Sequence, residues 1–219
     1  MSRVYFSLSV AVVLATLAVS AWFYPGLPER VPMHWNIHGQ VDGYGPKSVA
    51  AFLMPGVMAA LLALFLALPW LSPKHFELDS FRDTYWFIVL ILTGLIAYIQ
   101  GVTLWAAAGG KVDVLRAILA GLTLMFGLIG NVLGKVRRNF WVGVRTPWTL
   151  ASERVWNDTH RLAGRMFVAA AGIGFVMLLL PLPTMTVFLL VIGLIMASAI
   201  IPAVYSAVLY KSLEGQGQV

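Results

Sequence analysis

The chain has 219 residues, of which 60% are hydrophobic and only 11% are charged, and its mean hydropathy is +0.85. One soluble domain of this size cannot bury so much apolar surface, so the composition indicates a membrane protein. There is no cysteine, which excludes disulfides, thiol nucleophiles and thiolate metal sites, and in a membrane protein the net charge of +6 usually reflects topology rather than binding of nucleic acid.

Six apolar segments are long enough to cross a bilayer core of about 30 Å as helices. Because backbone polar groups in lipid must be satisfied within each segment, the sequence predicts an all-α bundle. The segments span about 4–24, 49–71, 85–108, 114–134, 164–180 and 185–209. The first contains Val19-Ser20-Ala21 behind Arg3, which resembles a signal-peptide cleavage site, but we expect an uncleaved first helix.

A polar passage, VPMHWNIHGQVDGYGPKS at 31–48, separates the first two segments. Its imidazole, carboxylate and aromatic groups predict a shaped polar surface that meets an external ligand, and its glycines exclude a regular helix. The candidate ligand-binding residues are His34, Trp35, Asn36, Gly39, Asp42, Tyr44 and Lys47. Two alternatives are a divalent metal on His34, His38 and Asp42, and a rigid loop without a ligand at the headgroup level.

The spans themselves carry few chemical groups. No ionisable residue falls in the middle of a span, which argues against an ion or proton pathway. The amides of Gln100 and Asn131 are expected to hydrogen-bond between helices, and Gly130 and Gly134 form a G-x-x-x-G pair that favours close helix packing or a homodimer. No cofactor motif is present, and we predict neither a cofactor nor a resident metal.

A second polar passage lies between the fourth and fifth spans, at 139–164. Thr146 followed by Pro147 predicts a helix start, and Trp148, Ala151, Val155, Leu162 and Met166 recur at helical spacing, which predicts an amphipathic helix on the inner membrane surface. Glu153, Asn157 and His160 share another face, either as a polar site or as a network that docks the helix. The candidate partner-binding residues are Asn139, Arg145, Thr146, Pro147, Trp148, Glu153, Trp156, Asn157, His160 and Arg161.

Basic residues predict the orientation. With the N-terminus inside, the cytoplasmic segments hold eleven of the 15 Lys and Arg residues, and the outer segments hold four. The eleven are Arg3, Lys74, Arg82, Lys135, Arg137, Arg138, Arg145, Arg154, Arg161, Arg165 and Lys211. Both termini and the passage at 139–164 are therefore predicted to face the cytoplasm, and the passage at 31–48 to face outward.

Two motifs resemble known families. Pro32-x-His34-Trp35-Asn36-x-x-Gly39-x-x-Asp42-x-Tyr44-x-x-Lys47 is similar to a small membrane domain of unknown function that often precedes the SdpI module. Asn139-x-x-x-Gly143-x-Arg145-Thr146-Pro147-Trp148-Thr149-Leu150, followed by Glu153-x-Val155-Trp156-x-x-Thr159-His160-Arg161-x-x-Gly164, is similar to the SdpI signature. The chain is thus expected to have an N-terminal domain at 1–72 and an SdpI-like domain at 73–219.

The resemblance implies a multi-pass protein of the bacterial cytoplasmic membrane that gives immunity to a secreted peptide toxin and holds a cytosolic repressor at the membrane. Other classes stay open from the residues alone. One is an enzyme that acts at the interface through His34 and Asp42 or through Glu153 and His160, although the sequence has no H-E-x-x-H or G-x-S-x-G pattern. The other is a small transporter or lipid exporter.

Overall fold

The computed structural model describes residues 1–73 and 78–218. Six of its helices are long and apolar enough to cross a membrane, and they match the six predicted segments in order, which confirms the all-α bundle. They are α1 (Ser2–Phe23), α2 (Lys47–Leu71), α3 (Arg82–Ala107), α4 (Val114–Leu133), α6 (Glu153–Leu179) and α7 (Thr184–Glu214). The smaller elements are η1 (Tyr24–Gly26), β1 (Arg30–Trp35), β2 (Val41–Pro46), η2 (Asp79–Phe81) and α5 (Pro147–Ala151).

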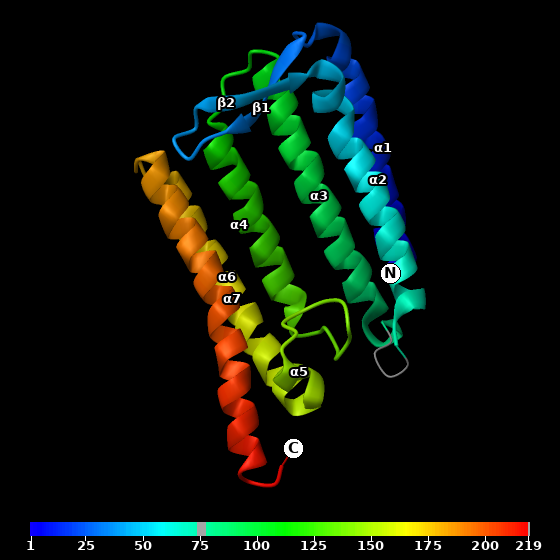
Figure 1. The fold of residues 1–219 in the computed structure, drawn as a ribbon, viewed down its shortest axis with the longest axis vertical. Helices are drawn as coiled ribbons and strands as arrows, with labels where there is room; N and C mark the ends of the chain where they lie inside the picture. The colour runs from blue at the N-terminus through cyan, green and yellow to red at the C-terminus, as the bar shows by residue number, and fades with distance from the viewer. Residues whose placement is uncertain (74–77, 219) are drawn as a thin grey trace.

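The helices pack as two groups of three (Figure 1). Helices α1, α2 and α3 contact one another on one side, α4, α6 and α7 contact one another on the other, and α3 packs against α4 between them. The strands β1 and β2 lie across one end, here called the hairpin end. Both chain termini lie toward the opposite end, here called the α5 end (Figure 1).

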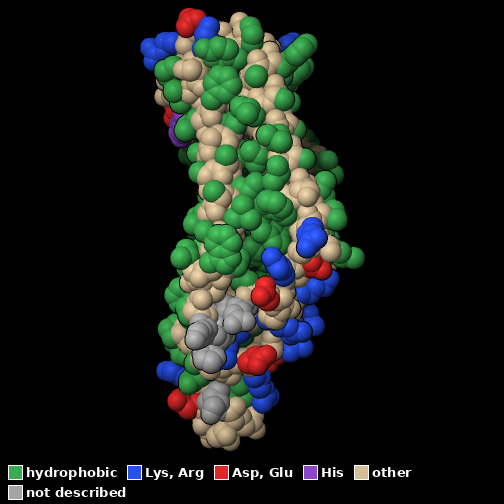
Figure 2. Space-filling model, turned by 90° about the vertical axis from the view of Figure 1, so that its right-hand side faces the viewer, with side chains coloured by type: hydrophobic (Ala, Val, Ile, Leu, Met, Phe, Trp, Pro, Cys, Tyr) green, Lys and Arg blue, Asp and Glu red, His purple; other side chains and the backbone are tan. Residues whose placement is uncertain are grey.

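The outer surface of the bundle is apolar along most of its length. Large apolar side chains of the spanning helices are exposed, among them Leu14, Leu64, Val176 and Val208. Figure 2 shows apolar side chains along the middle of the molecule and charged ones gathered at one end, with a smaller group at the other. Lipid is the solvent that makes such a surface stable, so the chain is a multi-pass membrane protein.

The concentration of basic residues at the α5 end agrees with the pattern from which the orientation was predicted. Lys74, one of the basic residues assigned to the cytoplasmic side, lies outside the described residues. The N-in orientation stays a prediction, since the fold fixes which segments share an end and leaves open which end faces the cytoplasm.

Two glycines allow α4 and α6 to cross in close contact. A Cβ atom added at Gly130 would lie 2.8 Å from the carbonyl oxygen of Gly164, and one added at Gly164 would lie 2.7 Å from the carbonyl oxygen of Gly130. The G-x-x-x-G pair of α4 therefore serves packing within the chain at its first glycine. At Gly134 the nearest atom is the Cγ of Arg161, at 3.7 Å, so this position is less tight.

The two intramembrane amides have different environments. The Gln100 amide nitrogen on α3 donates to Ser20 Oγ of α1 at 3.0 Å and to the carbonyls of Ala50 and Ala51 on α2, at 3.0 and 3.1 Å. The predicted interhelical role of Gln100 is thus confirmed. Asn131 was expected to do the same, but its side chain is exposed and makes no hydrogen bond with the described residues, so that prediction was wrong.

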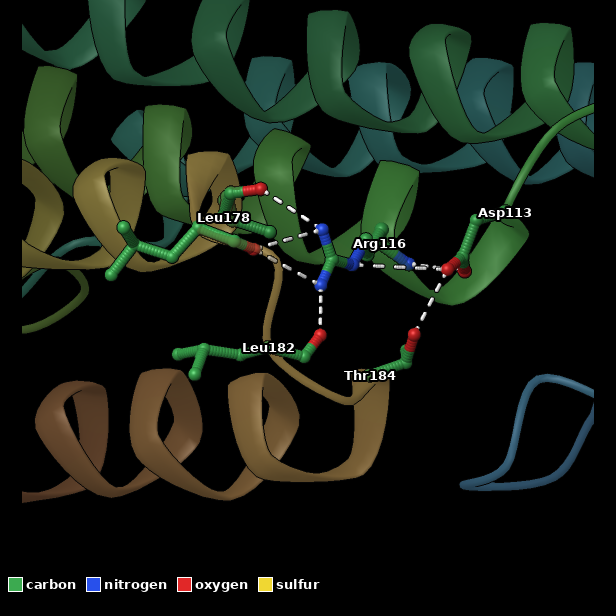
Figure 3. A network of polar contacts seen from close by, with 6 residues as sticks. Asp113, Arg116, Leu178, Leu182 and Thr184 are labelled. Atoms are coloured by element: carbon green, nitrogen blue, oxygen red, sulfur yellow. Dashed lines mark hydrogen bonds and ion pairs between the residues drawn. The ribbon is translucent and has the colours of Figure 1, made fainter.

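At the hairpin end, Arg116 joins the start of α4 to the turn between α6 and α7 (Figure 3). Its guanidinium donates to the carbonyls of Leu178 (3.2 Å), Leu180 (3.5 Å) and Leu182. These carbonyls come at and after the last turn of α6, where helical acceptors have no partner within the helix. Asp113 completes the link, because it caps α4 through the Arg116 N–H (3.0 Å) and accepts from the Thr184 hydroxyl (3.0 Å).

Replacing Arg116 by methionine is expected to lower the unfolding temperature by several degrees, because the carbonyls it caps lose their donors while the apolar stem is kept. Hydrogen bonds to charged groups contribute about 1.5–3 kcal/mol. Thermal unfolding in detergent measures the change. Lys111→Met removes the same charge from an exposed position at the same end and should leave the unfolding temperature unchanged; an equal loss in both variants would contradict the capping role.

The predicted amphipathic helix over 146–164 was wrong in its extent and in its buried face. A short helix, α5, ends at Ala151. The next residue, Ser152, has an extended backbone (φ −129°, ψ 126°), and its hydroxyl accepts from the Val155 N–H at 3.5 Å. From Glu153 the chain runs as a single helix into the fifth span. Because the helix is interrupted at Ser152, the residues after it do not keep the helical spacing with those before it. The predicted apolar face that begins with Trp148 and Ala151 therefore does not continue into α6. The buried residues of this stretch are Thr149, Val155, Trp156, Thr159, His160, Ala163 and Gly164.

Candidate functional site

The outer passage, for which the sequence excluded a regular helix, folds as an antiparallel hairpin. Strand β1 pairs with β2 from Arg30 opposite Pro46 to Trp35 opposite Val41, with irregular register around His34. Gly43 lies opposite His34, and a Cβ atom there would come within 2.9 Å of the His34 Cβ. The glycines of β2 thus give space to the side chains of β1.

The hairpin turn is built on Asn36 and Gly39. The Asn36 side-chain oxygen accepts from the backbone N–H groups of His38 (2.9 Å) and Gln40 (3.0 Å), which mimics a backbone turn. Gly39 has φ +75°, a conformation that other residues adopt at a cost. These two candidate ligand residues therefore shape the turn.

His34 and Asp42 form the main polar pair of the hairpin. The imidazole Nδ1 lies 2.5 Å from Asp42 Oδ1, and the side chains are 73% and 43% exposed. Tyr44 is also exposed, whereas Trp35 is half-buried. His34, Asp42 and Tyr44 are thus available to a ligand that arrives from the aqueous side.

Lys47 closes the neck of the hairpin. Its Nζ lies 2.6 Å from Glu29 Oε1 and 5.4 Å from the centre of the Tyr24 ring. Its backbone N–H also donates to the Glu29 carbonyl at 3.3 Å. Lys47, predicted as a ligand-binding residue, is therefore placed to hold the hairpin at the start of α2.

Beneath the hairpin lies a cavity of about 290 Å³, here called the hairpin cavity. Its walls come from β1, α2, α3 and α4, so it joins the two helix groups. They are mostly apolar, with His34 and Trp35 on the hairpin side and the buried amide of Gln100 on the helix side. An apolar cavity with a few placed polar groups suits an amphipathic ligand.

The described residues contain no group of three or more His, Asp or Glu side chains that could hold a metal ion. His34 and Asp42 are paired with each other, and His38 lies on the exposed turn. The arrangement brings together two of the three side chains in the metal alternative.

At the α5 end, the sequence predicted a helix start at Thr146 and Pro147, and the structure confirms it. The Thr146 hydroxyl accepts from the Thr149 N–H, while Thr149 Oγ1 accepts from the Thr146 N–H, so each satisfies the other. Thr146 Oγ1 also lies 2.9 Å from Ser206 Oγ on α7. Trp148 is half-buried and Pro147 is exposed in this one-turn helix.

Trp156 and His160 are fully buried and stack on each other, with ring centres 4.0 Å apart. The Trp156 indole N–H donates to the Val136 carbonyl at 2.8 Å, and the Val144 N–H donates to His160 Nε2 at 3.0 Å. Since Nε2 accepts a backbone N–H, the proton sits on Nδ1, which donates to the Trp156 carbonyl at 2.8 Å. Both ring nitrogens are occupied, so this imidazole docks the loop onto α6 and is not free for proton transfer.

The loop before α5 is built around the buried side chain of Asn139. Its amide nitrogen donates to the carbonyls of Arg137 and Val142, both at 2.9 Å, and its oxygen accepts from two backbone N–H groups. Gly143 follows with φ +115°, and a Cβ there would overlap the His160 ring. The close approach of this loop to His160 therefore needs glycine.

The remaining inner candidates do not form one site. Glu153 is exposed, Asn157 is half-buried, and the hydrogen-bond partners of the His160 ring are Val144 and Trp156 instead. Arg145 donates to the Phe140 carbonyl at 2.5 Å, and Arg161 pairs with Asp158 at 2.7 Å. The predicted polar face is thus split into a buried docking residue and an exposed basic surface.

The sequence did not predict the arginine side chains that donate hydrogen bonds to backbone carbonyls. Arg116 and Arg138 donate to the carbonyls of Leu182 and Leu150 respectively. A carbonyl acceptor leaves no residue-type signal, so only the position of an arginine near a helix end could have pointed to these contacts.

Comparison with known proteins supports both resemblances. Residues 11–59 match the domain of unknown function DUF1648, and residues 135–206 match the SdpI/YfhL protein family. The chain is 26% identical over 209 residues to a protein named immunity protein SdpI, from Bacillus subtilis (strain 168), and the match covers 95% of this chain and 97% of that protein. No solved structure matches the chain. The chain thus carries an SdpI family domain behind DUF1648, in a multi-pass bacterial membrane protein.

Proposed function

We propose that this chain, with its SdpI family domain, is a membrane immunity protein whose hairpin end receives a secreted peptide toxin. The observation that carries the proposal is the similarity to immunity protein SdpI along almost the whole of both chains. Such coverage includes the hairpin, the spans and the α5 end together. The proposed activity is therefore that of the entire bundle.

The hairpin cavity supports a peptide with an apolar side. Its walls are mostly apolar, and His34 lines it with Asp42 as a hydrogen-bonded partner. A toxin that inserts an apolar side chain between β1 and the helices would meet the polar pair with its backbone. We infer that His34, Trp35 and Asp42 contact the toxin, and that Asn36, Gly39 and Lys47 keep the hairpin in shape.

The α5 end supplies the surface for the second part of the proposal, a cytosolic repressor. Because His160 and Trp156 are fully buried, a partner cannot touch their side chains in this conformation. Exposed residues of the inner motif are the ones a partner would meet, and they include Arg145, Pro147, Glu153 and Arg161. Recruitment of a repressor therefore rests on this exposed surface and on an N-in orientation.

Cells that lack their own immunity protein should survive a higher dose of toxin when they produce this chain. His34→Ala and Trp35→Ala should each lower the protective dose about tenfold, since truncating a central contact residue costs more than 1 kcal/mol. Survival would be measured against peptide toxins from which the Bacillus immunity protein is first shown to protect the same cells, and against the peptides secreted by this chain's own host. Membrane abundance would be measured in the same cultures.

His38→Ala is the matched control, because His38 is exposed on the same hairpin and its side chain does not line the hairpin cavity. It should protect within twofold of the unaltered chain. Absence of protection from both toxin sources, at normal membrane abundance, would overturn the immunity proposal. Protection that survives the loss of His34 and Trp35 would overturn the hairpin as the receiving surface.

A further inference from the structure

A groove between α4 and α6 near the α5 end combines positive charge with a lipid-facing position. It has a volume of about 450 Å³ and is here called the arginine groove. Its lining includes Gly130, Asn131, Gly134, Arg161, Arg165 and Val168. Arg161 and Arg165 are one turn apart on α6 and also border a second hollow, of about 430 Å³, next to Tyr205 of α7.

The charge in the arginine groove is only partly neutralised. Arg161 pairs with Asp158 at 2.7 Å, and its side chain is 61% exposed. Arg165 is exposed and makes no hydrogen bond or ion pair with the described residues. At least one guanidinium thus faces outward with all of its donors open to an anion.

The depth of Arg165 in the bilayer indicates which groups its side chain can reach. The backbone of Arg165 lies about 21 Å along α6 from Leu179, which is at the hairpin end. Because the hydrocarbon core is about 30 Å thick, this position is nearer to the core boundary at the α5 end. Helical side chains lean toward the helix N-terminus, which for α6 is the α5 end, so the Arg165 side chain is directed toward the nearer headgroups. Its charge is therefore placed where lipid phosphates lie.

Asn131 gives an independent indication. Its amide is exposed on α4, about 26 Å from Val114, and has no partner among the described residues. An amide that faces lipid without a hydrogen bond is costly, so a polar group from the surroundings is needed at this position. Because Asn131 lines the same groove as both arginines, one ligand can satisfy all three.

We propose that the arginine groove binds the headgroup of an anionic phospholipid in the leaflet at the α5 end. The lipid phosphate would lie between Arg161 and Arg165, its glycerol oxygens would reach the Asn131 amide, and an acyl chain would run along Val168. Gly134 leaves room for this approach, since it is exposed and a Cβ atom there would meet no atom nearer than the Arg161 Cγ, at 3.7 Å. A second copy of this chain is the less suitable occupant, because a symmetric contact would bring the same arginines together.

The test compares the purified protein in nanodiscs of phosphatidylglycerol and of phosphatidylcholine with the same acyl chains, at one ionic strength. Thermal unfolding and the lipids retained in native mass spectrometry are the two readouts. The unaltered chain should unfold at a higher temperature in phosphatidylglycerol and retain it preferentially. Each of Arg161→Gln and Arg165→Gln should weaken retention about fivefold, as expected for one basic residue near anionic lipid.

Arg3→Gln is the charge control, because Arg3 is an exposed residue on α1, in the other helix group. It should keep the preference for phosphatidylglycerol. Asn131→Leu should lose part of the preference while its unfolding temperature in phosphatidylcholine stays the same or rises, which separates a ligand contact from a folding defect.

Four outcomes would overturn the proposal. One is an unaltered chain without preference between the two lipids. Another is an equal loss of preference in Arg3→Gln, which would show a general response to charge. The third is an equal stabilisation by inorganic phosphate in phosphatidylcholine nanodiscs, which would assign the groove to a soluble anion. A dimer in the mass spectra that is lost in Arg165→Gln would likewise assign the groove to a second copy.

Discussion

Replacing Gly164 by leucine is expected to remove most of the folded protein from the membrane. The position has no space for a side chain, because the Gly130 carbonyl lies 2.7 Å from where a Cβ would stand. Backbone cannot move aside as a flexible side chain can, and α4 would have to separate from α6 along their whole contact. Overpacking of this kind costs about 1–3 kcal/mol for a few added carbons and more where the backbone must shift.

Gly172→Leu is the matched control for this prediction. Gly172 lies two turns further along the same helix, with nothing within 4 Å of its added Cβ. Membrane abundance and the unfolding temperature in detergent would be compared for both variants. If Gly164→Leu accumulated as a stable protein at the level of Gly172→Leu, the close crossing of α4 and α6 would be wrong.

The second large effect is expected from His160→Ala. The change leaves the Val144 N–H without its acceptor, removes the imidazole donor from the Trp156 carbonyl, and removes the ring stacked on Trp156. An unsatisfied buried group costs about 1–3 kcal/mol, and the space left by the ring adds to this. Protein abundance, protection and partner recruitment should therefore fall together.

His34→Ala should differ from His160→Ala in kind. His34 is exposed, so its loss should reduce protection while abundance and unfolding temperature stay near those of the unaltered chain. Trp156→Phe offers an intermediate case, since it loses the indole bond to Val136 but keeps the aromatic ring. A His160→Ala protein that is abundant and folded, yet inactive, would show that His160 acts in a site rather than in docking.

Hydropathy was sufficient to predict the helices, because a span must carry its own hydrogen bonds and a continuous apolar surface. The hairpin was not predicted. Glycine is depleted in strands, so Gly43 and Gly45 obscured the pattern of β2, although they lie there to accommodate His34 and Met33. The expected domain boundary at residue 72 stays a prediction, and in the structure α3 packs with α1 and α2 as well as with α4.

The inner motif shows another limit of sequence reasoning. His160 and Glu153 are both polar residues of one helix, and spacing alone does not tell which of them is buried. The loop before α5 decides this, because it packs against His160 through the Val144 N–H, whereas Glu153 lies exposed in the first turn of α6. The role of Arg116 was not predicted for a different reason. Its partners are main-chain carbonyls, which every residue possesses.

The hairpin cavity has walls from both helix groups, so a molecule bound in it can change how the two groups are placed relative to each other. Leu53 and Ile99 belong to one group, and Leu115 belongs to α4 in the other. A molecule wedged between them sets the spacing of α3 and α4 near the hairpin. Helix α4 moves as a rigid element. Its end away from the hairpin leads directly into the loop that is bound to His160 through the Val144 N–H. A tilt of α4 at the hairpin would therefore also move its other end, at the α5 end. Binding in the hairpin cavity would then be coupled to the arrangement of the exposed arginines.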